Sequence, residues 1–302
     1  MKFIRFQHGS SELSGVLTDL GIVSFPEIAG RMGIPLPPDL LGFIQADLTS
    51  SIVDLSPDLD VIPFTEVKAL LPYDVPPKIW CIGLNYKSHA VDIDAVQPDE
   101  PGSFMKPASC MFQPEGEIIL PPAEVSNDVD AEGELGVIIG KECRFLDAGD
   151  VSEAIFGYTT TLDLTALDVL RKNPRYLTRA KSIDTFFSFG PVIVTADEIR
   201  NVDSLEVITE HNGGVCSRDF VYNMHHRPFE LIRFHSDFFT LQPGDLISTG
   251  CPKGARIKAG DKVRARIEGV GTLGASVRQG ERKSILRREF RGQAASADRS
   301  AS

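Results

Sequence analysis

The sequence lacks several features that would assign the protein to a broad class at once. It has no run of about 18 apolar residues that could cross a membrane, and "MKFIRF" is not followed by the apolar stretch of a secretory signal. Its five cysteines are scattered and include no C-x-x-C pair, which argues against a disulfide framework or a zinc site of that pattern. We therefore expect free thiols in a reducing compartment and a cytoplasmic protein.

Basic residues are outnumbered by acidic ones: the 302 residues include 31 Lys and Arg against 42 Asp and Glu, which gives a formal net charge of -11. This balance argues against nucleic acid or an anionic membrane as a partner. Long helical patterns are rare, and "RPFELIRFHSDFF" and the shorter "ALDVLRKNP" are the clearest. Short strand-like segments separated by turns dominate instead, and they predict a mixed α+β, β-rich fold of the sandwich or closed-roll type.

The chain divides into three predicted parts. Residues 1–72 contain alternating segments such as "SGVLTDLGIVSF" and a short helical pattern in "PPDLLGFIQAD", which predict a small N-terminal α+β domain. The Pro-rich "LLPYDVPPK" follows as a linker, so we place the main domain at residues 73–285. The small, polar residues 286–302 predict a disordered tail.

Two acidic residues stand at the entrance of an apolar strand in "DAEGELGVIIG". Side chains i and i+2 share one face of a strand, so Glu132 and Glu134 should converge. Asp163 in "TTTLDLT" offers a third inward carboxylate. Because like charges held together repel each other, a hard divalent cation such as Mg²⁺ would stabilise the group. The alternative is a solvated pair of glutamates at the mouth of a strand.

Two further stretches carry candidate catalytic residues. In "CIGLNYKSHA" a strand ends near Gly83, and His89 follows, with Asp92 three residues later on the predicted helical turn. An acid there can orient a histidine that acts as a base. Lys181 in "RAKSIDTFFSFGP" could hold a substrate carboxylate or stabilise a developing enolate. The alternatives are a surface histidine beside an acid and a lysine that extends to solvent.

Four stretches, taken together and in order, resemble the signature segments of the fumarylacetoacetate hydrolase family. They are "IWCIGLNYKSHA", "DAEGELGVIIGK", "GYTTTLDLTALD" with "AKSIDTFFSFGP", and "PGDLISTGCPKG", and the resemblance covers residues 78–274. It implies a fumarylacetoacetate hydrolase-like mixed β-roll catalytic domain after a small N-terminal domain, usually in a homodimer. It also implies a small 2-oxo or 1,3-dicarbonyl acid as substrate, with Mg²⁺ or Mn²⁺ as cofactor.

The resemblance also assigns roles to individual residues. It makes Glu132, Glu134 and Asp163 the metal ligands. It makes His89 the general base, with Asp92 where relatives commonly have glutamate, and Lys181 the active-site lysine.

Three positions depart from the family pattern in the substrate-binding region. Leu167 and Leu170 replace the usual arginine and glutamine, and Cys251 replaces the threonine of "TGTP". A pocket with these residues should prefer an apolar or short distal group, unless Arg175 or Arg179 replaces the missing arginine.

The first reading is therefore a Mg²⁺-dependent hydrolase that cleaves a C–C bond in an acylpyruvate-like acid. The alternative is a decarboxylase, isomerase or keto–enol tautomerase that uses the same metal site on an oxaloacetate-like substrate. A third reading is a degenerate member that binds a ligand without turnover.

Overall fold

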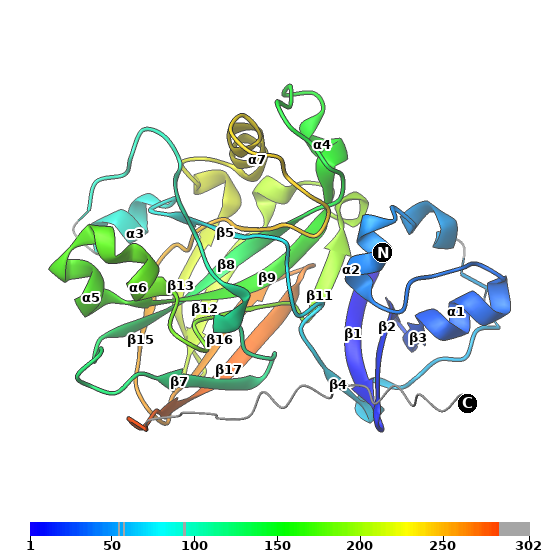
Figure 1. Cartoon of the computed structure of the whole chain (residues 1–302), viewed down its shortest axis with the longest axis horizontal. Coiled ribbons are helices and arrows are strands. Elements are labelled where there is room, and N and C mark those ends of the chain that lie inside the picture. Colours follow the sequence, from blue (N-terminus) through cyan, green and yellow to red (C-terminus); the bar gives the residue numbers. More distant parts are fainter. Residues whose placement is uncertain (54, 57, 93–94, 284–302) are drawn as a thin grey trace, which may run out of the picture.

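Two β-sheets form the framework of the protein, as the strand-rich sequence predicts (Figure 1). The computed structural model describes residues 1–53, 55–56, 58–92 and 95–283. The tail predicted at residues 286–302 lies outside the described residues. Within them, the protein is mixed α+β and rich in strands, which confirms the predicted class.

The larger sheet contains the strands that position the candidate site. Its main path runs β3 (Gly21–Ser24), β2 (Ser11–Thr18), β1 (Lys2–His8), β11 (Val192–Thr195), β9 (Ile155–Ala166), β8 (Val129–Ile139), β14 (Leu246–Ser248), β5 (Ile79–Gly83) and β6 (Gly102–Met105). Shorter strands join it at the side: β10 (Phe187–Phe189), β15 (Ala255–Ile257) and β4 (Val67–Ala69). The antiparallel pair of β8 and β9 is at its centre, and β14 pairs with β5 in parallel.

The smaller sheet packs against β8 and β9. Its order is β13 (Gly214–Phe220), β12 (Glu206–His211), β16 (Lys262–Ile267), β17 (Gly271–Gln279) and β7 (Gly116–Leu120). Ala131 and Leu162 of the larger sheet pack with Ala265 and Leu273 of the smaller one in a common core. These inward side chains are apolar at alternate positions, which is the pattern that a face between two sheets requires.

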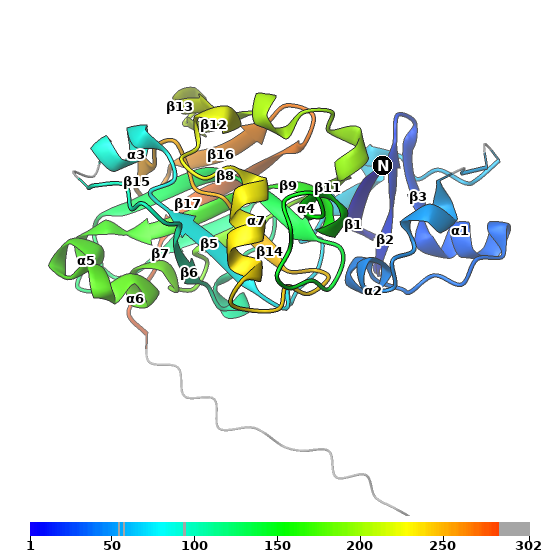
Figure 2. The same ribbon diagram turned by 90° about the horizontal axis from the view of Figure 1, so that it is seen from above.

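The helices of the described residues are short. They are α1 (Phe25–Met32), α2 (Leu40–Gln45), α3 (Lys87–Asp92), α4 (Val151–Ala154), α5 (Leu167–Lys172), α6 (Leu177–Lys181) and α7 (Pro228–Ser236). The helices predicted from "RPFELIRFHSDFF" and "ALDVLRKNP" are present as α7 and α5. Figures 1 and 2 show α3, α5 and α6 together at one end of the molecule, opposite the N-terminal strands and α1.

The N-terminal strands continue the larger sheet, because β1 pairs with β11. Phe3 of β1 packs on Phe43 of α2 with ring centroids 5.0 Å apart. The same core includes Ile79 and Phe187 from beyond the linker. The sheet and this core therefore extend across the predicted boundary at residue 72. The division into domains at residues 1–72 and 73–285 stays a prediction.

Candidate active site

Glu132 and Glu134 point to the same side of β8, away from the smaller sheet. Gly133 between them faces that sheet, where a Cβ atom would lie 2.7 Å from Thr209 Oγ1 and 2.9 Å from Ala265 Cβ. A larger residue would force the two sheets apart, so glycine at this contact fixes which face of β8 each neighbour occupies. Both glutamates are buried as a result.

Asp163 lies opposite Glu132 on the neighbouring strand. The antiparallel register of β8 and β9 pairs these two residues directly, which brings their side chains to one face of the sheet. Carboxylate oxygens of Glu132, Glu134 and Asp163 lie within 4.8 Å of one another, and all three residues are buried. The structure thus brings together the three acids that the sequence singled out, within reach of one cation.

Two lysines bind this acidic group. Lys181 Nζ, at the end of α6, donates to Glu132 Oε2 at 2.8 Å and to Asp163 Oδ2 at 2.9 Å. Lys106, which directly follows β6, donates to Asp163 Oδ1 and, at 2.7 Å, to the carbonyl oxygen of Phe186. The sequence predicted Lys181 but gave no signal for Lys106, whose carboxylate partner is 57 residues away along the chain.

The charges in the site favour a divalent cation. Burial, with repulsion by Asp163 and Glu132, raises the pKa of Glu134 to about 8. Burial also acts on Glu132, but the Lys181 ammonium and His89 outweigh it and hold its pKa below the ordinary value. A cation between the carboxylates would relieve the repulsion, and a set of oxygen donors suits Mg²⁺ or Mn²⁺. The residues therefore fit a hard divalent ion.

Glu134 is further oriented by two neutral donors. The backbone N–H of Gly250 donates to Glu134 Oε2 at 2.9 Å, and the hydroxyl of Ser248 donates to the same oxygen. Gly250 has a φ of 93°, in the region that favours glycine. The loop after β14 therefore holds one carboxylate of the site in place through its backbone.

His89 lies on α3, beside the carboxylates. Burial lowers the pKa of His89, against the opposite influence of Glu132, so the imidazole is neutral near pH 7. The expected hydrogen bond to Asp92 is not formed in the described part of the chain. Asp92 Oδ1 instead lies 2.8 Å from Lys253 Nζ, and His89 Nδ1 is buried without a partner there. The physical reason is that Lys253 offers Asp92 an opposite charge.

A cavity of about 470 Å³ opens onto these groups. His89, Glu132, Glu134, Lys181 and Cys251 border it on its polar side. Its apolar lining includes Ile82, Phe104, Pro174 and Leu177 as well as Leu167 and Leu170, the two leucines that replace polar family residues. The site therefore combines a charged end with a mostly apolar wall.

The arginine that borders the cavity is not one that the sequence pointed to. Arg171 of α5 lines the cavity and forms an ion pair with Asp128. Arg179, expected beside the substrate, is not among the lining residues, and its guanidinium lies 5.9 Å from the centre of the Tyr176 ring. The position of Arg171, one turn along from Leu167 on α5, could have drawn attention to it.

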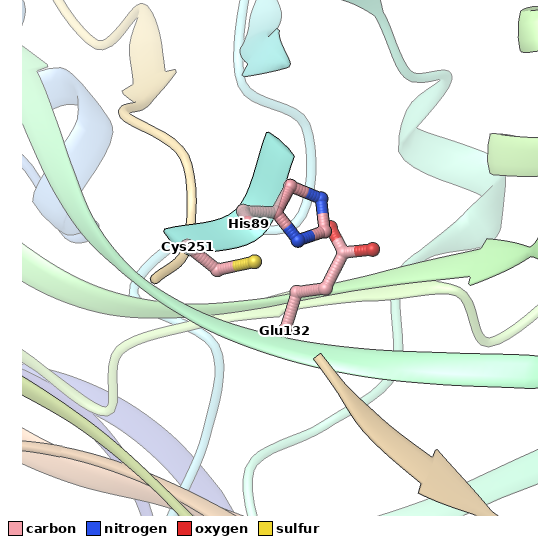
Figure 3. A group of neighbouring side chains, drawn as sticks. All are labelled: His89, Glu132 and Cys251. Atoms are coloured by element: carbon pink, nitrogen blue, oxygen red, sulfur yellow. The ribbon is translucent and has the colours of Figure 1, made fainter. Parts of the chain in front are cut away.

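Cys251 lies beside His89, and both residues line the cavity. Its side chain points towards His89 and Glu132, and the three side chains come from the loop after β14, from α3 and from β8 (Figure 3). Cys251 is only 2% exposed.

Comparison with known proteins identifies a family over most of the chain. The fumarylacetoacetate (FAA) hydrolase C-terminal family profile matches residues 78–278. The chain belongs to the fumarylacetoacetate hydrolase family. A bovine relative, the mitochondrial oxaloacetate tautomerase FAHD2A, is 36% identical over 250 residues, which are 79% of this chain and 79% of that protein.

Solved structures of the family are similar over nearly the whole chain. The maleylpyruvate hydrolase from Sphingobium sp. SYK-6, in complex with manganese(II) and pyruvate, has a TM-score of 0.77 and 29% identity and covers 93% of this chain and 100% of its own. The 2-hydroxyhepta-2,4-diene-1,7-dioate isomerase from Mycobacterium marinum has a TM-score of 0.71 and 29% identity, with 92% and 98% covered.

These relatives and the family match make the chain a metal-dependent enzyme that acts on small oxo acids. The observed strand-rich fold, with a small region before the family domain, agrees with this assignment. None of the helices in the described residues is long and apolar enough to cross a membrane.

Proposed function

We propose that this enzyme is an oxaloacetate tautomerase, which interconverts the keto and enol forms of a small 2-oxo diacid with the help of Mg²⁺ or Mn²⁺. The proposal places the alternative reading of the sequence ahead of C–C bond hydrolysis. The observation that carries it is the state of His89, a buried neutral base whose ring has no carboxylate hydrogen-bonded to it among the described residues. The similarity to the bovine oxaloacetate tautomerase, at 36% identity, supports the same choice.

The residues of the site suit a proton transfer. A divalent cation held by Glu132, Glu134 and Asp163 would supply a Lewis acid for the substrate's oxo group. His89 would take a proton from the carbon beside the carbonyl and return one to the carbonyl oxygen, so that a C–H bond is exchanged for an O–H bond. Lys181 would stabilise the negative charge that develops on that oxygen. No water enters this reaction, so no group is needed to activate one.

The far end of a short diacid would meet Arg171. This arginine lies on the same wall as the leucines that replace the usual polar residues of the family, and its partner Asp128 is about a quarter exposed. Guanidinium groups bind carboxylates through two parallel hydrogen bonds. We therefore expect a distal carboxylate to be accepted when the acid is short, as it is in oxaloacetate.

The test is a direct assay of enolisation. The purified enzyme, supplied with Mg²⁺ or Mn²⁺, should speed the change in ultraviolet absorbance as enol-oxaloacetate converts to the keto form, beyond the rate with metal alone. A parallel assay for pyruvate detects decarboxylation, and a panel of acylpyruvates detects C–C hydrolysis. Rapid acylpyruvate cleavage without acceleration of enolisation would overturn the proposal.

Hydrolysis is the second candidate, because the maleylpyruvate hydrolase is similar over 93% of this chain. Hydrolysis would require His89 to activate water, and an acid partner would then orient the ring. The variant Asp92→Asn separates the two readings. A loss of activity as large as that of His89→Ala would mean that the His89–Asp92 pair forms during turnover, and it would favour the hydrolase.

The pH dependence of the reaction should report on His89. Because burial lowers the pKa of His89, the base stays unprotonated down to a pH below its ordinary value of 6.5. At saturating metal, kcat/KM should therefore fall only as the pH drops through a midpoint under 6.5 and should be flat just above it. An acidic limb with its midpoint above 6.5 would contradict this assignment.

The two leucines should set substrate preference. Leu167 and Leu170 both border the cavity and offer no hydrogen bond to a second carboxylate beside them. A carboxylate left unpaired there costs about 1–3 kcal/mol. Leu167→Arg with Leu170→Gln should raise kcat/KM for a long diacid relative to a monoacid acylpyruvate by about tenfold or more. Lys172→Gln, an exposed change on the same helix, is the control. An unchanged ratio in the double variant would show that the leucines do not shape specificity.

Two further proposals concern the enzyme as a whole. We propose that the enzyme is cytoplasmic, because its scattered cysteines are expected to be free thiols in a reducing compartment. We also propose that it is a homodimer, which is the usual state of the family. Light scattering during size-exclusion chromatography would give the mass in solution, and a monomer would contradict the second proposal.

A further inference from the structure

A second group of potential metal ligands lies next to the carboxylate site. Donor atoms of His89, Glu132 and Cys251 lie within 4.8 Å of one another, and all three residues are buried. They are 8%, 3% and 2% exposed, and they border the same cavity. Figure 3 shows the imidazole, the thiol and the carboxylate pointing towards one another.

One nitrogen in this group has no hydrogen bond within the described part of the chain. His89 Nδ1 is buried and unpartnered, although buried polar atoms almost always have a partner. The nearby acid that could have satisfied the ring, Asp92, is paired with Lys253. The ring therefore keeps a free nitrogen in a group that already contains a thiol and a carboxylate.

The chemistry of the three donors selects a different ion from the neighbouring carboxylate site. A sulfur, a nitrogen and an oxygen form the mixed set that Zn²⁺ accepts, whereas Mg²⁺ prefers oxygen alone. Ligands at about 2.0–2.3 Å around a tetrahedral ion are about 3.3–3.8 Å apart. Atoms that already lie within 4.8 Å of one another therefore need to close by at most about 1.5 Å. The fourth position of such an ion would face the cavity.

We infer that His89, Glu132 and Cys251 form a second cation site, selective for thiophilic divalent ions such as Zn²⁺ or Cd²⁺. On binding, the Cys251 thiol releases its proton to solvent. The site shares Glu132 with the Mg²⁺ or Mn²⁺ site, so the two ions compete for this carboxylate. Zn²⁺ bound here also occupies His89, and it therefore inhibits the enzyme. The inhibition rests on the proposed function, but the binding does not.

Cd²⁺ is the probe that tests the binding without any measurement of activity. Cadmium bound by a thiolate produces an ultraviolet charge-transfer band, which can be titrated. The test uses chains in which the more accessible Cys143 and Cys216 are replaced by serine, so that their thiols do not contribute. We expect one Cd²⁺ per chain with this band when Cys251 is present, and no band in Cys251→Thr, which restores the residue usual in the family.

One further variant and one competition experiment test the other two ligands. His89→Ala should weaken Cd²⁺ binding by about tenfold or more, because a ligand is lost. Excess Mg²⁺ should raise the apparent Kd for Cd²⁺, because Glu132 is shared. A band that persists in Cys251→Thr, no band in either protein, or Cd²⁺ affinity that is indifferent to Mg²⁺ would overturn the inference.

Should Cys251→Thr fail to fold, alkylation of the unmodified enzyme gives the same answer. Mass spectrometry would follow the labelling of each cysteine with and without Cd²⁺. Selective protection of Cys251, in the absence of protection at Cys81 and Cys110, supports the site. Equal labelling of Cys251 in both conditions contradicts it. A failed tautomerase assay would leave either result intact.

Discussion

Replacing Glu132 with alanine is expected to abolish the turnover that Mg²⁺ or Mn²⁺ supports. Its carboxylate is one of three whose oxygens lie within 4.8 Å of one another. Its loss leaves Asp163 as the remaining carboxylate bound to Lys181 among the described residues. Mutation of residues that only hydrogen-bond to metal ligands already lowers metal affinity by roughly 10–100-fold. We therefore expect Mn²⁺ affinity, measured by calorimetry or by the electron paramagnetic resonance of free Mn²⁺, to fall by more than about 100-fold.

Two controls separate loss of the ion from loss of the fold. Glu132→Gln keeps the volume of the side chain and removes its charge, so it should bind Mn²⁺ as poorly as the alanine variant while its thermal unfolding stays cooperative. Asp261→Asn removes another buried carboxylate, which bonds to His211 outside the cavity lining, and should keep the parental affinity for Mn²⁺. Parental Mn²⁺ binding by Glu132→Ala would show that the ion binds elsewhere.

The carboxylate group could be predicted from the sequence because its geometry is local. Alternation along a strand places Glu132 and Glu134 on one face whatever the rest of the chain does. Gly133 points to the other face of β8, where it packs closely against Ala265 of the smaller sheet. The two glutamates are therefore on the face turned away from that sheet, and this could not be predicted from the local sequence. Asp163 was predicted from its place in the strand-like "TTTLDLT", and the family resemblance then gave it a role as a metal ligand. Its position directly opposite Glu132 depends on strand register.

Other parts of the site depend on contacts between distant segments, which spacing does not reveal. Lys106 reaches Asp163 across the sheet, and nothing near it in the sequence marks it as buried. The proximity of His89 and Asp92 on a helical turn predicted a pair, yet Lys253 competes for the acid from the loop after β14. Short-range spacing gives the possible partners of a charged group, and the fold decides among them.

The partner that the fold gives to Asp92 also explains why tautomerisation is proposed ahead of hydrolysis. A histidine paired with an acid would favour activation of water, and the sequence on its own placed hydrolysis first. In the structure Asp92 is neutralised by Lys253, while Lys181 and Lys106 surround Asp163 with positive charge. Within the described residues the His89 ring has no hydrogen-bonded acid, and it lies beside Lys181 and carboxylates that can hold a divalent cation. This arrangement suits the removal of a carbon-bound proton with stabilisation of the resulting enolate.

His89→Ala is expected to lose the enolisation of oxaloacetate while the affinity for Mg²⁺ or Mn²⁺ stays nearly unchanged. His89 is buried at the edge of the carboxylate group but is not among its three oxygen ligands. Removal of a general base typically costs about 10²–10⁴-fold in rate. The loss should appear in kcat at saturating Mn²⁺, and the acidic limb of the pH profile should disappear with it.

The cavity left by His89→Ala also provides a positive test. Added imidazole should restore part of the rate, and the restored rate should rise with pH as imidazole loses its proton, because the neutral form is the base. A merely structural role for His89 would give no such rescue. Unaltered turnover in His89→Ala would remove His89 from the mechanism, and the base would then have to be sought among the other ionisable groups of the cavity.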